Sequence, residues 1–120
     1  MAKFASQAVQ DGALDVISTA TEMYICNGQP VSRADAITKA RHAAAIVMAS
    51  GDFAKTTSVA DRVLTVTGKS VTANSTGTVD HVALCTGTSL LYVTTGTAQT
   101  ANSGSSISVA NFTVTATALV

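Results

Sequence analysis

Two histidines are the residues of this chain with the most potential for catalysis. His81 directly follows Asp80, and a histidine oriented by a carboxylate is a common general base. Successive residues of a β-strand point to opposite faces, so we expect Asp80 and His81 not to orient each other, and we interpret His81 as a surface or interface residue. His42 follows Arg41 at an expected junction between elements, where capping or solvation explains it equally well. The histidines therefore predict no catalytic base.

Two cysteines could pair, react or bind a metal. Cys26 and Cys85 lie far apart in the sequence, and neither belongs to a C-x-x-C motif or another ligand spacing. We expect both to be buried free thiols that behave as small apolar residues, with a disulfide as the alternative. Neither histidine has an acidic residue three or four positions away, so we expect no metal ion and no cofactor.

Motifs for a nucleophile or a phosphate site are also missing from the sequence. No serine lies in a G-x-S-x-G elbow, and the Gly–Thr-rich stretches lack the lysine and the strand-to-helix context of a phosphate-binding loop. β propensity explains the many threonines. We therefore predict that the protein is not an enzyme. The competing hypothesis, a small enzyme or ligand-binding domain, requires a concave site with perturbed titratable groups.

The charge balance argues against nucleic acid and membrane partners. The 120 residues carry a formal net charge of +0 and only 12% are charged, so no basic surface for DNA, RNA or an anionic bilayer is expected. Low charge with 47% hydrophobic residues favours a protein partly covered by neighbours. The N-terminus lacks the apolar core of a secretory signal, and the longest apolar run, Ala43–Ala49, is far shorter than the ~20 residues that span a bilayer. We expect synthesis and residence in a cytoplasm.

Composition changes near Asp61, and most charged residues lie at or before it. We interpret residues 1–61 as a helical part with one or two strands and residues 62–120 as an all-β part. They form a single domain, 1–120, because no linker separates them. The expected elements of the first part are an amphipathic helix from Ser6 to about Thr19 that buries Val9, Ala13, Val16, Ile17 and Ala20, a strand at Glu22–Asn27, a helix capped by Ser32 and ending near Arg41, and a strand within Ala43–Ala49.

The second part is organised around a β-hairpin. The hairpin spans Val79–Thr95, and its turn, Thr86–Ser89, contains Gly87, which can adopt the positive φ that hairpin turns demand. The hydrophobic pattern changes phase near Ala110–Asn111, which indicates an inserted residue, as in a β-bulge, or a corner. The other expected elements are a loop around Lys55–Ala60, a strand at Arg62–Thr67, a strand at Ser70–Ala73 that pairs back on it, a strand end plus loop at Gly96–Gly104, and a final element at Ile107–Leu119.

These elements predict a mainly β (α+β) fold, a small antiparallel β-sandwich with one or two N-terminal helices packed on its side. Such sheets have open edges, and many threonines with few lysines protect them poorly, so we expect partner strands or neighbouring subunits to cover them. Aromatic residues are too few for a ligand-stacking platform. We interpret Tyr24, Phe53, Tyr92 and Phe112 as core or interface anchors. Phe4 could anchor the N-terminal arm on a neighbour or pack locally.

Several segments together resemble small virion proteins encoded among the structural genes of tailed bacteriophages. The segments are RVLTV at 62–66, TGTVDHVAL at 76–84, LLYVTT at 90–95 and VANFTV at 109–114, preceded by GALDVIST at 12–19 and MYICNGQP at 23–30. The resemblance covers most of the chain, and residues 32–50 depart from it. Its motifs are structural and include no catalytic signature.

The resemblance implies a capsid decoration (cement) protein that lies on the capsid surface of the virion. Its partners would be the major capsid protein, which it bridges on the assembled head, and further copies of itself in a trimer or dimer. A tail-tube, head-completion or fibre-associated component is the alternative. From exposure alone, we expect the N-terminal arm and two polar loops to contact neighbours. The predicted interface residues are Ala2, Lys3, Phe4, Asn74, Ser75, Thr76, Asn102 and Ser103.

Overall fold

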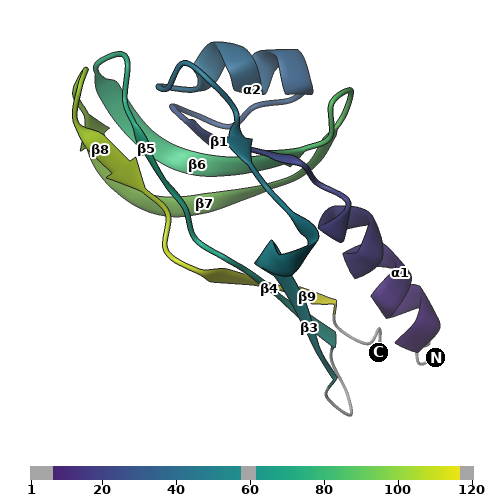
Figure 1. Cartoon of the computed structure of the whole chain (residues 1–120). Coiled ribbons are helices and arrows are strands. Elements are labelled where there is room, and N and C mark those ends of the chain that lie inside the picture. The colour runs from purple at the N-terminus through teal and green to yellow at the C-terminus, as the bar shows by residue number, and fades with distance from the viewer. Residues whose placement is uncertain (1–6, 58–61, 117–120) are drawn as a thin grey trace, which may run out of the picture.

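Two α-helices and nine β-strands follow one another in the described part of the chain (Figure 1). The computed structural model describes residues 7–57 and 62–116. The elements in chain order are α1 (Gln7–Ser18), β1 (Glu22–Cys26), α2 (Arg33–Lys39), β2 (Ile46–Val47), the 3-10 helix η1 (Ser50–Asp52), β3 (Phe53–Thr57), β4 (Arg62–Val66), β5 (Ser70–Thr72), β6 (Gly77–Cys85), β7 (Leu90–Ala101), β8 (Ser106–Ser108) and β9 (Phe112–Ala116). These elements confirm the predicted mainly β (α+β) class, and the paired strands are antiparallel.

The predicted hairpin lies in the main sheet, whose strand order is β2–β1–β6–β7. β6 is internal in this sheet and β7 is at its edge. The Thr86 N–H closes the turn by donating to the Ser89 carbonyl at 2.8 Å. The expected positive φ at Gly87 is wrong. Thr86 Oγ1 instead accepts the Ser89 N–H at 3.1 Å, and this side-chain bond stabilises the turn without a left-handed residue.

A long antiparallel ribbon packs against the main sheet, with β4 and β5 on one side and β8 and β9 on the other. Leu64 pairs with Val114 before an interruption, and Val71 pairs with Ile107 after it. Leu64 and Val71 are seven residues apart, and Ile107 and Val114 are also seven residues apart. Neither strand therefore has an extra residue relative to the other. Both strands change their inward face together. The phase change near Ala110–Asn111 is therefore a corner of the ribbon and not a β-bulge.

Gly68 lies at this corner, and the backbone of residues 109–111 passes close to it. A Cβ there would lie 2.6 Å from the carbonyl carbon of Ala110 and 2.7 Å from the nitrogen of Asn111, so only glycine permits the approach. The Gly68 N–H donates to Asn111 Oδ1 at 2.6 Å. Lys69 Nζ lies 2.9 Å from Asp52 Oδ1 and ties the corner to η1.

The main sheet is covered on both faces. One face meets the ribbon and α1 in the main core, and the other meets α2 (Figure 1). The main core contains Leu14, Ala20, Met23, Ile25, Ile46, Met48, Leu64, Val66, Ala73, Val79, Val82, Leu84, Ala101, Ile107 and Val114. The smaller cluster under α2 contains Tyr24, Cys26, Ala36, Ala83 and Cys85.

α2 is capped by Ser32 as predicted and is fastened to β1. Ser32 Oγ accepts the Asp35 N–H at 3.1 Å. Arg33 donates from Nε and Nη2 to the two carboxylate oxygens of Glu22 at 2.9 and 3.0 Å. This bidentate pair fixes the helix over the sheet, because planar guanidinium and carboxylate groups match in geometry. The helix ends at Lys39, close to the predicted end.

α1 forms as predicted, and the prediction that Ile17 and Ala20 face the core is confirmed, but the prediction for Ala13 and Val16 is wrong. Leu14 is 1% exposed and Ile17 packs against the main core, whereas Ala13 is exposed and Val16 is 56% exposed. Leu14 and Ile17 are three residues apart and share a face. Burying these two large side chains removes more apolar surface from water than burying Ala13 and Val16 would.

Four strand assignments differ from the sequence-based ones. The loop expected around Lys55–Ala60 is wrong for its described part, which belongs to β3, and residues 58–60 lie outside the described residues. Residues 70–72 pair with β8 and not with β4. β7 continues to Ala101 because β6 begins at Gly77 and pairs with that end. β2 is only two residues of the predicted strand Ala43–Ala49.

Candidate functional site

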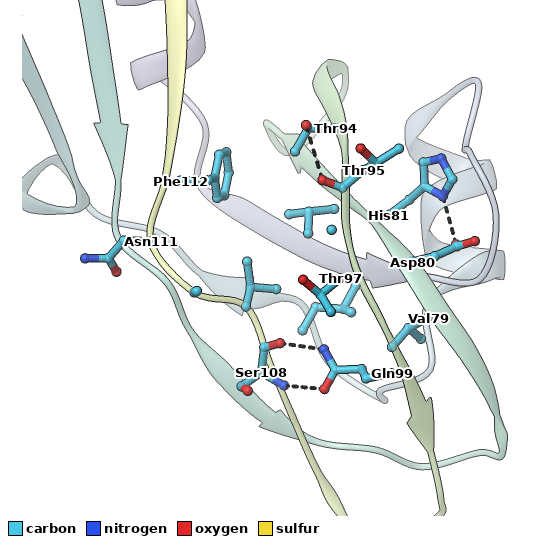
Figure 2. A pocket seen from close by; sticks show the side chains of 15 residues that line it. Val79, Asp80, His81, Thr94, Thr95, Thr97, Gln99, Ser108, Asn111 and Phe112 are labelled. Atoms are coloured by element: carbon cyan, nitrogen blue, oxygen red, sulfur yellow. Dashed lines mark hydrogen bonds and ion pairs between the residues drawn. The ribbon is translucent and has the colours of Figure 1, made fainter.

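A groove of about 670 Å³ lies between the main sheet and the corner of the ribbon (Figure 2). Val79 and Val82 of β6 line it from the sheet. Residues 94–97 and Gln99 of β7 lie on one side, and residues 108–112 lie on the other. Most of the polar groups that line it are uncharged hydroxyls and amides, which suit hydrogen bonding to a neutral ligand or backbone.

The groove coincides with an irregularity in β7. Between the pairs Val79–Gln99 and His81–Thr95, β6 has one residue and β7 has three. Extra residues on one strand form a bulge that bends the strand and interrupts the ladder. Gly96 lies in this segment, and a glycine inside a strand pattern is a sequence signal for a bulge. The sequence-based interpretation took Gly96 as the end of the strand.

Asp80 and His81 form a pair beside the groove. His81 Nδ1 lies 2.8 Å from Asp80 Oδ1, and Figure 2 shows the two side chains directed toward each other. The expectation that they could not orient each other is wrong. Val79 and Val82 both lie in the main core although they are three residues apart, so side-chain alternation is interrupted between them. The two intervening side chains therefore share the other side of the strand.

Asp80 is fixed by a second contact. Its Oδ1 also accepts the Gly28 N–H at 2.9 Å, and Gly28 has a φ of +87°, a conformation that favours glycine. The hydrogen bonds from His81 and from Gly28 lower the pKa of Asp80. The carboxylate stays ionised near neutral pH and orients the imidazole, which is the arrangement of a histidine held by a carboxylate.

The thiol nearest this pair is buried and protonated. Cys26 is the cross-strand partner of His81, is 0% exposed, and donates from Sγ to the Ala36 carbonyl at 3.6 Å. Burial raises the pKa of Cys26 to about 12 and also raises that of Cys85. Both cysteines are free, so the prediction of buried free thiols is confirmed and the disulfide alternative is wrong. Protonated, buried thiols are poor nucleophiles.

His42 is a structural residue of the core. Its Nε2 accepts the Ile25 N–H at 3.0 Å, and its Nδ1 lies 2.7 Å from the Ala44 carbonyl, so the neutral tautomer with a proton on Nδ1 satisfies both contacts. The ring stacks on Tyr24 with centroids 5.9 Å apart. The solvation expected for His42 is wrong, because the residue is only 5% exposed. Burial lowers its pKa.

Gln99 closes one end of the groove (Figure 2). Its Nε2 donates to the Ser108 carbonyl at 2.5 Å, and its Oε1 accepts the Ser108 N–H at 3.2 Å. The side-chain amide therefore takes the place of a paired strand residue and joins β7 to β8. No motif in the sequence indicates this role, because the partner backbone is brought close only by the folded ribbon.

Two polar loops that contain predicted interface residues meet at one end of the molecule. The Ala73 N–H donates to the Ser105 carbonyl at 2.7 Å, and the Gly104 N–H donates to the Ala73 carbonyl at 2.8 Å. This contact brings residues 74–76 next to residues 102–105, and we call the two loops the tip. Asn74, Thr76, Asn102 and Ser103 are exposed, and Ser75 is half-buried. The predicted interface residues Ala2, Lys3 and Phe4 lie outside the described residues.

The described residues were also compared with the features of metal sites and membrane-spanning helices. Within residues 7–57 and 62–116, no three His, Cys, Asp or Glu side chains gather closely enough to hold a metal ion. The described helices include none long and apolar enough to cross a membrane.

Comparison with family models, with curated proteins and with solved structures finds no match to this chain. The groove beside Asp80 and His81 is a concave site of the kind that an enzyme or ligand-binding domain requires, so the absence of enzymatic activity stays a prediction.

Proposed function

We propose that the protein decorates the head of a tailed bacteriophage, where it binds the outer surface of the assembled shell and bridges capsid subunits. Support comes from the resemblance of its strand segments to small virion proteins. The neutral composition and the surface rich in threonine and serine fit a protein whose surface is partly covered by neighbouring subunits in an assembly. The buried, protonated thiols and the structural His42 fit a scaffold more closely than a reaction centre.

The observation that carries the proposal is the position of the tip. The tip lies at the opposite end of the molecule from the start of α1 and the end of β9 (Figure 1), and the longest dimension is 51 Å. The other predicted interface residues, Ala2, Lys3 and Phe4, precede α1 in the sequence, and contacts through both segments would connect neighbouring subunits. Residues 74–76 and 102–105 include no charged side chain, so docking would use shape and hydrogen bonds and would depend little on salt.

Decoration acts through the thermodynamics of binding. A protein that binds the assembled shell and not its separate subunits stabilises the shell by an amount that grows with its free concentration. Many equivalent sites on a symmetric lattice, with two contacts for each copy, add avidity to individually weak interfaces. A small rigid fold without an active site suffices for this role.

The test is binding of purified protein to expanded empty heads. We expect saturable binding at high copy number, a higher melting temperature of the heads, and little change in affinity between low and moderate salt. Binding at low copy number and only at a vertex would instead favour the head-completion or tail alternative. Absence from washed particles, with the protein itself folded, would contradict the proposal.

A further inference from the structure

β7 ends the main sheet with an unpaired edge. Among the described residues it pairs with β6 alone, so alternate backbone N–H and C=O groups face away from the sheet. Residues 92–95 pair in regular register with residues 81–84, and shifts in register flank this stretch on both sides. The regular stretch of the edge is therefore Tyr92–Thr95.

The side chains at this edge are apolar on both faces of the sheet. Leu91 and Tyr92 pack against the main core, and Leu90 and Val93 pack against the cluster under α2. All four remain partly exposed. Apolar residues on both faces are typical of a strand inside a sheet, whereas edge strands usually carry charges or proline. β7 contains neither a charged residue nor a proline.

The other half of the same edge is protected against pairing. From Gly96 the strand bulges, which bends the edge and interrupts its regular spacing. Beyond the bulge, Gln99 joins β7 to β8 through both backbone groups of Ser108. The contrast within one strand identifies Tyr92–Thr95 as the part that is available to a partner strand.

We propose that a second copy of the chain pairs its own β7 antiparallel to this edge and joins the two main sheets. Opposite residues of an antiparallel pair both turn their N–H and C=O groups toward the partner or both turn them away. Neighbouring residues along a strand turn these groups to opposite sides, so a symmetric pair cannot place a residue opposite its sequence neighbour. One residue must therefore lie opposite its own copy on the two-fold axis. An axis at Val93 or Thr94 lies in the middle of the regular stretch. This inference does not rest on the proposed function.

Charge and side-chain chemistry favour a second copy over a different partner. The chain has a formal net charge of +0 and β7 has no charged residue, so two copies meet without like-charge repulsion, and an acidic or basic peptide would find no complementary charge on the strand. The partly exposed Tyr92 and Val93 would lie against the same residues of the second copy. Aromatic and β-branched residues are favourable cross-strand neighbours.

A cysteine scan tests the pairing and its register. The full-length variants Tyr92→Cys, Val93→Cys, Thr94→Cys and Thr95→Cys are oxidised with diamide, and dimers are measured on non-reducing gels. A residue opposite its own copy falls within the Cα separation of about 4.4–6.8 Å that a disulfide needs, so we expect Val93→Cys or Thr94→Cys to cross-link best. Thr88→Cys in the exposed β6–β7 turn is the control and should stay monomeric, as should the parent chain with its buried thiols. The proposal would be contradicted by cross-linking at none of the four scanned positions. It would also be contradicted by cross-linking to the same extent at those four positions and at the control Thr88.

Opposite charges on the strand provide a second test that needs no oxidation. The parent chain should sediment at twice its monomer mass of 12.1 kDa at high concentration. Thr94→Lys and Thr94→Glu should each weaken self-association at least ~10-fold, and their equimolar mixture should restore it, because unlike charges then face each other. Thr88→Lys should dimerise as the parent does. A parent chain that is monomeric or trimeric throughout, or a mixture that fails to recover, would overturn the β7 interface, whatever the result with phage heads.

Discussion

His42 Nε2 accepts the backbone N–H of Ile25 at 3.0 Å, and this bond takes the place of a strand neighbour beside β1. β2 pairs with β1 only at Glu22 and Met23, so the backbone of Ile25 depends on residues 41 and 42 for its partners. The Arg41 N–H donates to the Ile25 carbonyl at 3.3 Å. The buried imidazole and the Arg41 N–H thus together supply the partners of the Ile25 backbone at this edge of the main sheet.

The His42 contact predicts that stability falls in mild acid. Burial lowers the pKa of His42 below its ordinary 6.5, so the unfolded chain binds a proton at a higher pH than the folded chain does. As pH falls below about 6.5, the free energy of unfolding should decrease by at most about 1.4 kcal/mol per pH unit for this one group. The carboxylates with lowered pKa values, Glu22, Asp35, Asp52 and Asp80, lose their contribution only at lower pH, below about 4.5.

Urea unfolding at a series of pH values from 7.5 to 5, roughly the range in which histidine titrates, measures the His42 effect. His42→Gln keeps an acceptor for the Ile25 N–H without a titratable ring, so its stability should change less with pH over this range. His42→Leu leaves that N–H unpaired and should be less stable than His42→Gln at pH 7.5 by about 1–3 kcal/mol. The same pH dependence in the parent chain and in His42→Gln would show that another group is responsible.

The corner of the ribbon predicts a strong dependence on Gly68. In Gly68→Ala, the new Cβ would collide with the Val109 carbonyl oxygen and crowd Ala110 and Asn111. These contacts are with backbone, which cannot rotate away, so the free energy of unfolding should fall by about 1–3 kcal/mol or more.

A matched glycine distinguishes this crowding from the general effect of replacing glycine. Gly87 has open space around its Cβ position and no positive φ, so Gly87→Ala should change stability by no more than about 0.5 kcal/mol. Thermal and urea unfolding of the two variants provide the comparison. Equal stability of Gly68→Ala and Gly87→Ala would contradict the close approach at the corner.

The elements predicted correctly are those whose signals are local. Ser32 with Asp35 three residues later is a sufficient N-cap signal, and the polar turn at Thr86–Ser89 between two apolar runs is sufficient for the hairpin. β3 was missed because FAKTT is polar for much of its length, and its place beside β4 depends on a partner later in the chain. β5 was paired with the wrong strand for the same reason, since β8 is distant in sequence.

The candidate site was less predictable than the fold, because its parts depend on departures from regular geometry. Strict alternation places Asp80 and His81 on opposite faces, and the interruption between Val79 and Val82 brings them together. The groove forms where β7 bulges beside the corner of the ribbon. Gly96 and the phase change near Asn111 were each visible in the sequence, but nothing local indicates that they face each other.

The burial of Cys26 predicts that its thiol reacts slowly in the folded protein. A rise in pKa from 9.0 to about 12 lowers the thiolate fraction on the order of a thousandfold at a given pH, and the side chain is 0% exposed. Folded protein should therefore react with Ellman's reagent at pH 8 far more slowly than protein in guanidinium, where two thiols per chain should be titrated. Cys85→Ala isolates Cys26. Rapid reaction of Cys26 in this variant while it is folded, or a titre below two in the unfolded parent, would contradict the assignment.

The bonds between Gln99 and Ser108 predict a local effect on the groove. Gln99→Ala removes both hydrogen bonds and should lower the free energy of unfolding by about 1–2 kcal/mol, the amount expected for two partly exposed bonds. The Ser108 amide should exchange with deuterium faster in this variant by more than the global loss of stability accounts for, whereas amides in β1 should change only by that global loss. Thr100→Ala, an exposed position on the same strand, is the control for loss of β propensity. Unchanged exchange at Ser108 in Gln99→Ala would show that Gln99 does not close the groove.

The tip predicts where a charge would interfere with head binding if the decoration proposal is correct. Asn102 and Ser103 are exposed on the tip, so Asn102→Asp and Ser103→Glu should leave the melting temperature of the isolated protein nearly unchanged. Either charge would have to be buried without a partner at a docked interface, and the affinity for expanded heads should fall at least ~10-fold, which corresponds to about 1.4 kcal/mol. Thr88→Glu, in the exposed β6–β7 turn at the other end of the main sheet (Figure 1), is the control and should bind as the parent does. Equal binding by all three variants would exclude the tip as the docking surface, and it would leave self-association through β7 to be judged by its own measurements.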